Sequence, residues 1–247
     1  MKRNFIILIL LLLSSVAFGQ IKKSVEIPVN QNGDTTLVYK WIHELHGQLK
    51  INNLIYSNEL FHLRFWQDGQ VIDIWTIDNK TFQGQVTNYL WAYKPNYCKK
   101  KKPKTGKLYS NQNLLDAGQA RTAYNLFLID SIAYLPSEEK TPGWSKGSEG
   151  IAYCFEISTP NSYTFKSFWT PSAKDSLYNA KNIQNFVKNI NTYLNLAQFK
   201  TKFYDTLSGG SYSNGSMPLI LIPEKIKPDF YYDYDYDYDY DDYYLDY

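Results

Sequence analysis

Three extended runs of apolar, aromatic and β-branched residues occupy the first half of the chain, at residues 60–66, 71–77 and 81–93. Asp68-Gly69 separates the first two runs, and this dipeptide is the strongest short signal for a β-hairpin. The second run carries apolar side chains on both faces, so we expect both faces to be covered. Together the runs predict an antiparallel meander.

Apolar positions recur at helical spacing in two later segments. Residues 119–135 carry such a pattern, and a proline follows where a helix is expected to stop. In residues 172–194 the apolar positions are three or four residues apart, and the segment opens with capping-box spacing between Ser172 and Asp175. Residues 150–169 predict a second hairpin, and residues 217–223 predict a short strand.

Hairpins and not crossover connections link the predicted strands. We therefore expect an α+β fold in which an antiparallel β-sheet, built from a meander and hairpins, packs against two main amphipathic helices. Residues 20–228 would form a single domain, or two small subdomains with a boundary near residues 94–110. A disordered acidic tail over residues 229–247 would follow this domain.

The N-terminus has the layout of a secretory signal peptide. Lys2 and Arg3 precede an apolar run over residues 5–13, and small residues end at Gly19. This run is shorter than the roughly 20 residues that a membrane-spanning helix needs. Residues 1–19 therefore predict export, either to the periplasm or out of the cell, with no transmembrane segment left after cleavage.

Charge is divided unevenly along the chain. The formal net charge is +2, but residues 229–247 hold eight Asp and no Lys or Arg, and this tail charge of −8 leaves +10 on the remainder. Tyr and Asp alternate in the tail, and a row of unpaired carboxylates repels itself, so we expect disorder unless a counter-charge is present. The acidic tail would meet a basic surface, either a cationic protein surface on a partner or the lysine cluster at residues 99–104 of the same chain.

Divalent cations are the other counter-charge that the tail can attract. Asp235, Asp237 and Asp239 match the first ligand positions of an EF-hand loop, but the glycine of its sharp turn and its final glutamate are missing. We therefore expect no selective calcium site. Weak cation binding by Asp233, Asp235, Asp237 and Asp239 remains an expectation from charge density.

The segment G-W-S-K-G at residues 143–147 matches the nucleophile motif of α/β-hydrolases. That motif needs a following helix and a later histidine, whereas here a strand follows and His43, His46 and His62 all come earlier. We interpret the segment as a glycine-rich turn. A secreted serine hydrolase that uses Ser145 with an upstream histidine remains the alternative function.

Other catalytic and cofactor signatures fail. His43 and His46 are three residues apart, where zinc proteases need four, so we expect no metal site. The chain has no glycine-rich phosphate loop or dinucleotide fingerprint, so we expect no cofactor. The lysine cluster at residues 99–104 would suggest nucleic acid in a cytosolic protein, but the predicted export argues against that partner.

Cysteine and tryptophan leave two questions open. Cys98 and Cys154 are either a disulfide in an oxidising compartment or two buried thiols. Trp66, Trp75, Trp91 and Trp169 lie at or near predicted strands, where they either belong to the core or form a platform that stacks on a ligand such as a sugar ring. The sequence as a whole predicts an exported, non-enzymatic binding or envelope-associated module.

Overall fold

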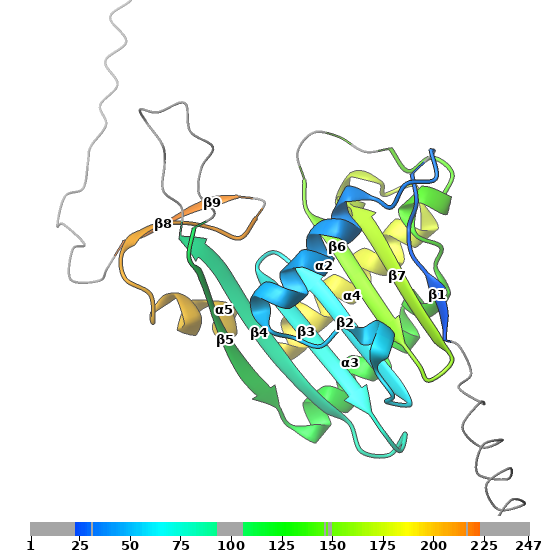
Figure 1. The fold of residues 1–247 in the computed structure, drawn as a ribbon, viewed down its shortest axis with the longest axis horizontal. Coiled ribbons are helices and arrows are strands. Elements are labelled where there is room, and N and C mark those ends of the chain that lie inside the picture. The colour runs from blue at the N-terminus through cyan, green and yellow to red at the C-terminus, as the bar shows by residue number, and fades with distance from the viewer. Residues whose placement is uncertain are drawn as a thin grey trace, which may run out of the picture.

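The computed structural model describes residues 23–30, 32–92, 106–145, 147, 150–215 and 217–222. Within these residues the chain forms a nine-stranded, mostly antiparallel sheet with four α-helices, which confirms the predicted α+β fold (Figure 1). Three predicted features lie outside the described residues: the signal peptide at residues 1–19, Cys98, and the tail at residues 229–247.

The sheet runs in the order β1, β7, β6, β2, β3, β4, β8, β9, and β5 also pairs with β4. All neighbours are antiparallel except β1 and β7, which are parallel. The strands are β1 (Ser24–Glu26), β2 (Phe61–Gln67), β3 (Gln70–Thr76), β4 (Gln83–Ala92), β5 (Leu108–Leu115), β6 (Ala152–Ser158), β7 (Ser162–Trp169), β8 (Gly210–Ser213) and β9 (Pro218–Leu221).

The predicted hairpins are confirmed. Asp68 and Gly69 join β2 to β3 with φ values of 32° and 75°, and a type I′ turn needs positive φ at both central residues. β6 and β7 form the second hairpin, and β9 lies in the predicted strand at residues 217–223. β5 was not anticipated.

The α-helices are α2 (Leu37–Leu49), α3 (Ala117–Ile129), α4 (Tyr178–Leu194) and α5 (Leu196–Tyr204). α3 opens with a capping box between Asp116 and Gln119, and it ends before the predicted limit at residue 135. The predicted helix start at Ser172 is wrong. Residues Pro171–Ala173 form a short 3₁₀ helix, and α4 begins only at Tyr178.

Both faces of the sheet are covered, as the apolar second run predicted. Strand residues such as Leu63 and Phe65 share one core with α3 and α4. On the opposite face, Trp66 and Val71 share a second core with α2. Figure 1 shows α2 crossing the front of the sheet while α3 and α4 lie behind it.

The start and the buried face of α2 are explained by local features that were not used to predict a helix here. The Thr36 side chain accepts a hydrogen bond from the Tyr39 amide and caps the first turn. Ile42, Leu45 and Leu49 are buried, and their spacing places them on one face. No helix in the described part of the chain combines the length and the apolar content needed to cross a bilayer.

Candidate functional site

An aromatic pocket of about 240 Å³ opens between α2, the β2–β3 turn and the β8–β9 turn. Trp41 from α2, Trp66 from β2 and Tyr89 from β4 form its aromatic walls. Trp91 extends this cluster, because its ring centroid lies 6.2 Å from that of Trp41 and 5.4 Å from that of Tyr89. The fold thus gathers four large aromatic side chains at one opening.

Two glycines let the turns approach the pocket walls closely. Gly69 has a φ of 75°, and a Cβ at this position would lie 3.1 Å from the carbonyl oxygen of Tyr89. Gly215 has a φ of 98°, and a Cβ there would lie 2.7 Å from the Trp41 ring. A larger residue at either position would strain the backbone and displace the turn that borders the pocket.

The polar groups at the pocket are neutral or already paired. Asp68 accepts a hydrogen bond from Lys200 Nζ at 2.6 Å and another from the Asn214 amide. Burial raises the pKa of Tyr89 above its usual range, and the nearby Cys154 and Asp68 raise it further, so the hydroxyl stays protonated. The pocket therefore offers flat apolar faces and little net charge.

A buried network of ion pairs lies beside the pocket, on the same face of the sheet. The strand register sets Arg64 of β2 opposite Asp73 of β3 and Glu156 of β6. Arg64 Nε donates to Asp73 Oδ1 at 2.7 Å, and a terminal nitrogen of Arg64 lies 3.7 Å from Glu156 Oε1. All three side chains are almost fully buried, so protein groups must replace water around their charges.

Glu156 connects this network to the aromatic pocket. Its carboxylate accepts hydrogen bonds from Trp66 Nε1 at 2.8 Å and from the Tyr163 hydroxyl at 2.9 Å, and it lies 2.9 Å from His46 Nε2. Burial opposes its ionisation, but the His46 hydrogen bond and the Arg64 charge outweigh burial and lower the pKa of Glu156. The hydrogen bond from the Trp66 indole N–H to Glu156 fixes the Trp66 ring as a wall of the pocket.

His62 lies at the other end of the network. Its Nε2 atom is 2.9 Å from Asp73 Oδ1, and its ring stacks on Trp75 with 5.6 Å between centroids. Burial opposes ionisation of Asp73, yet the Arg64 charge and the His62 hydrogen bond lower its pKa below the usual range. Both buried carboxylates are therefore ionised at neutral pH.

The structure separates the four tryptophans that the sequence analysis selected. Trp66 and Trp91 belong to the aromatic pocket and its extension. Trp75 is half-buried against His62, and Trp169 lies near Lys174, whose Nζ atom is 5.8 Å from the ring centroid. A single platform containing all four does not form.

Ser145 lies in an exposed loop, and its Oγ atom accepts a hydrogen bond from Lys174 Nζ at 2.5 Å. His46 and His62 are hydrogen-bonded to buried carboxylates, and none of the described contacts of the three histidines involves Ser145. A lysine that acts as a general base is normally buried, whereas this pair faces solvent. Among the described residues Ser145 contacts a lysine and no histidine, and the hydrolase stays a prediction.

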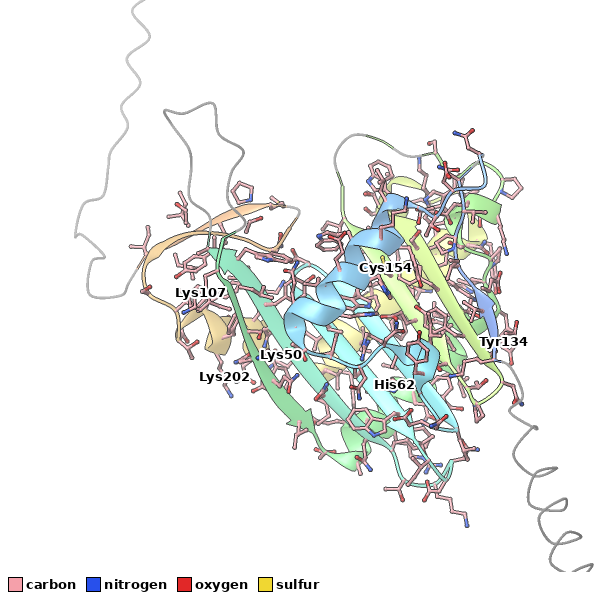
Figure 2. The ribbon with its side chains drawn as sticks, in the orientation of Figure 1. Lys50, His62, Lys107, Tyr134, Cys154 and Lys202 are labelled. Carbon is pink, nitrogen blue, oxygen red and sulfur yellow. The ribbon has the colours of Figure 1, made fainter. Side chains whose placement is uncertain are left out.

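The remaining predicted site residues lie partly outside the described chain. Cys154 is buried and lines the aromatic pocket beneath α2 (Figure 2), but Cys98 is not described, so the disulfide stays a prediction. The tail carboxylates at Asp233, Asp235, Asp237 and Asp239 are not described either. Within the described residues, no group of three or more His, Cys, Asp or Glu side chains is placed to hold a metal ion.

Comparison with models of known protein families, with curated proteins and with solved structures finds no match. The interpretation of this site therefore depends on its own geometry.

Sequence reasoning missed Trp41, Tyr89 and the ion-pair network. The network had a signal, because His62, Arg64 and Trp66 alternate with Leu63 and Phe65 along one strand. Such alternation assigns the polar residues to one face of the sheet. The pairing of that strand with β6, which brings Glu156 into the network, had no comparable signal.

Proposed function

We propose that this chain is an exported, non-enzymatic binding module whose ligand is a small planar ring held in the aromatic pocket. The observation that carries the proposal is the convergence of Trp41, Trp66 and Tyr89 on one hollow of about 240 Å³. Ligand sites are typically concave, mostly apolar and oriented by a few polar groups. The pocket has each of these properties.

The size and chemistry of the pocket limit its ligand. A cavity of about 150 Å³ holds benzene, so this pocket suits one or two fused rings and not a drug-sized molecule. Asp68 is paired with Lys200, and the Tyr89 hydroxyl is neutral, so the pocket has no spare charge for an ionic ligand. A neutral aromatic or heteroaromatic ring is the expected ligand class.

Export and the tail complete the proposal, and their support comes from the sequence. Residues 1–19 carry the signal-peptide layout, and residues 229–247 carry eight Asp. The module would act in the periplasm or outside the cell, with the tail directed at a cationic protein surface or at divalent cations. Deleting residues 229–247 should weaken binding to a cationic partner at low salt and leave ring binding unchanged.

Indole titration of the full mature protein tests the pocket. Binding should appear as saturation transfer in NMR and as a change in tryptophan fluorescence. Trp41→Ala removes a stacking face and should weaken binding about threefold to tenfold, from the usual strength of aromatic pairs. Ala152→Leu should fill part of the pocket and reduce binding further, because Ala152 lines it.

Tyr178→Ala is the matched control, because Tyr178 is an exposed aromatic residue of α4 that does not line the pocket. Equal indole affinity in the wild type, Trp41→Ala and Ala152→Leu would contradict the proposed site. Labelling of the wild type by a fluorophosphonate, with loss of label in Ser145→Ala, would instead support the serine hydrolase.

A further inference from the structure

A second hollow lies at the opposite end of β2 from the aromatic pocket. Two adjoining cavities of about 560 Å³ and about 350 Å³ share Asn52, Glu59 and His62 as lining residues, and we call them together the His62 cleft. His62 and Trp66 are four residues apart on β2, or about 13 Å in a strand. The His62 cleft and the aromatic pocket share no lining residue. Figure 2 labels His62 on the sheet and Lys50 just past the end of α2.

His62 is fixed in place but incompletely bonded. The side chain is 9% exposed, and its Nε2 atom is hydrogen-bonded to Asp73. Its Nδ1 atom has no hydrogen-bond partner in the described part of the chain, and Glu59 Oε2 is 4.0 Å away. A carboxylate only accepts, so the Nε2 atom carries the proton in the neutral ring, and the Nδ1 atom is then an acceptor.

The charges that line the cleft cancel. Lys50 and Arg64 supply two cations, while Glu59 and Asp73 supply two carboxylates. Lys50 would attract an anionic ligand while Glu59 would repel it, and a cationic ligand meets the reverse, so neither sign of charge is favoured overall. A neutral ligand matches a lining with no net charge.

The other lining groups are those that recognise hydroxyls. Asn52, Gln85 and Gln112 each carry an amide that both donates and accepts, which matches the dual character of a hydroxyl group. Half-buried Trp75 adds a flat apolar surface beside them. Hydroxyls around one edge and C–H groups on one face are the surface of a pyranose ring.

We propose that the His62 cleft binds a neutral sugar ring, with Trp75 against its C–H face and the amides of Gln85 and Gln112 on its hydroxyls. This site is additional to the aromatic pocket and does not depend on it. Arg64 and Asp73 form the floor of the cleft and hold His62 in its orientation.

The test is saturation-transfer NMR on the full mature protein with four probes: cellobiose and maltose as neutral sugars, and glucuronate and glucosamine as charged ones. Each sugar is tested at up to about 10 mM, which is enough to detect binding with a millimolar Kd. The neutral sugars should show transfer, and the charged ones should show less. Gln112→Ala removes an exposed amide and should weaken binding about twofold to tenfold, the range for one hydrogen bond.

Trp75→Leu should abolish transfer to the neutral sugars. If Trp75→Leu does not fold, which its thermal melting curve reports, Gln112→Ala carries the test. Gln198→Ala is the matched control, because Gln198 is an exposed amide on α5 that does not line the cleft. Trp41→Ala should leave sugar binding unchanged, which separates this site from the aromatic pocket. Tighter binding of a charged sugar, absence of transfer to every probe, or equal binding by the wild type and Gln112→Ala would overturn the proposal.

Discussion

Replacing Arg64 with methionine tests the buried network directly. Methionine keeps much of the apolar stem but removes the guanidinium between Asp73 and Glu156, which are 1% and 0% exposed. Removing one partner of a buried ion pair costs about 3–5 kcal/mol, because the other charge is left uncompensated. A domain of this kind has about 5–15 kcal/mol of stability, so the variant should fold but be much less stable.

The loss should depend on pH. Arg64 lowers the pKa of both carboxyls in the folded state, so without it both folded pKa values should rise, while the unfolded values stay near 4. A carboxyl with a raised folded pKa binds a proton more tightly in the native state. The penalty is therefore complete at pH 8, and it is relieved as the pH falls through the raised folded pKa, by about 1.4 kcal/mol for each pH unit below that pKa.

Urea unfolding measured by tryptophan fluorescence and circular dichroism gives the magnitude. With a denaturant slope near 2 kcal/mol/M, the midpoint at pH 8 should fall by about 1.5–2.5 M. Arg64→Lys keeps the charge but loses the planar fork, and it should cost about 1–2 kcal/mol. Lys40→Ala changes an exposed residue of α2 and should stay within about 0.5 kcal/mol of the wild type. A loss below about 1 kcal/mol at pH 8, or one that grows toward pH 5, would refute the reasoning.

Three further predictions follow from single residues. Lys166 Nζ donates to three backbone carbonyl oxygens, and burial lowers its pKa to about 8 from 10.5. The unfolded chain therefore binds the Lys166 proton more tightly than the folded chain does. Between pH 8 and about pH 10, the urea midpoint of the wild type should rise relative to that of Lys166→Met. A difference between the two midpoints that stays constant over this range would contradict the prediction. Gly84→Ala places a Cβ 2.8 Å from an isoleucine side chain, so it should cost about 1–3 kcal/mol of stability and lower the melting temperature. In Gly47→Ala, on α2, the added Cβ meets nothing within 4 Å, so this variant should raise the melting temperature. The opposite order would be inconsistent with the packing. Asp73→Asn should lower stability at pH 7, because the ionised carboxyl with its lowered pKa stabilises the fold. Acid removes this contribution from the wild type, so the acid unfolding of the variant, followed by circular dichroism below about pH 4, should depend less steeply on pH. An unchanged acid transition would contradict the role of Asp73 in the network.

Much of the fold was predictable because its signals are local. The Asp68-Gly69 turn fixed the register of the first hairpin, and the apolar runs located β2, β3 and β4. The start of α4 was not predictable in the same way. Ser172 and Asp175 have capping spacing, but Ser172 lies in a 3₁₀ turn, and the Asp175 side chain accepts from Gln184. Tertiary contacts replaced the local preference.

The candidate site was less predictable because three separate strands and a helix build it. Arg64, Asp73 and Glu156 are each unremarkable in sequence, and only the pairing of β3, β2 and β6 brings them together. Trp41 entered the pocket through α2, whose amphipathic pattern is short and includes polar residues such as His46 on its buried side. A polar residue on the buried face hides a helix from an apolar-periodicity argument.

The parallel pairing of β1 with β7 joins segments that are far apart in the order of synthesis. Ser24 pairs with Ser162, so the first strand has no partner until nearly 140 more residues have left the ribosome. At about 5–20 residues per second, that interval is roughly 7–28 seconds. Throughout it, β1 has not yet joined the sheet, and if residues 1–19 direct export as proposed, the segment next to them would still be accessible to an export machinery. The fold therefore completes this edge of the sheet only after the β7 segment has been synthesised.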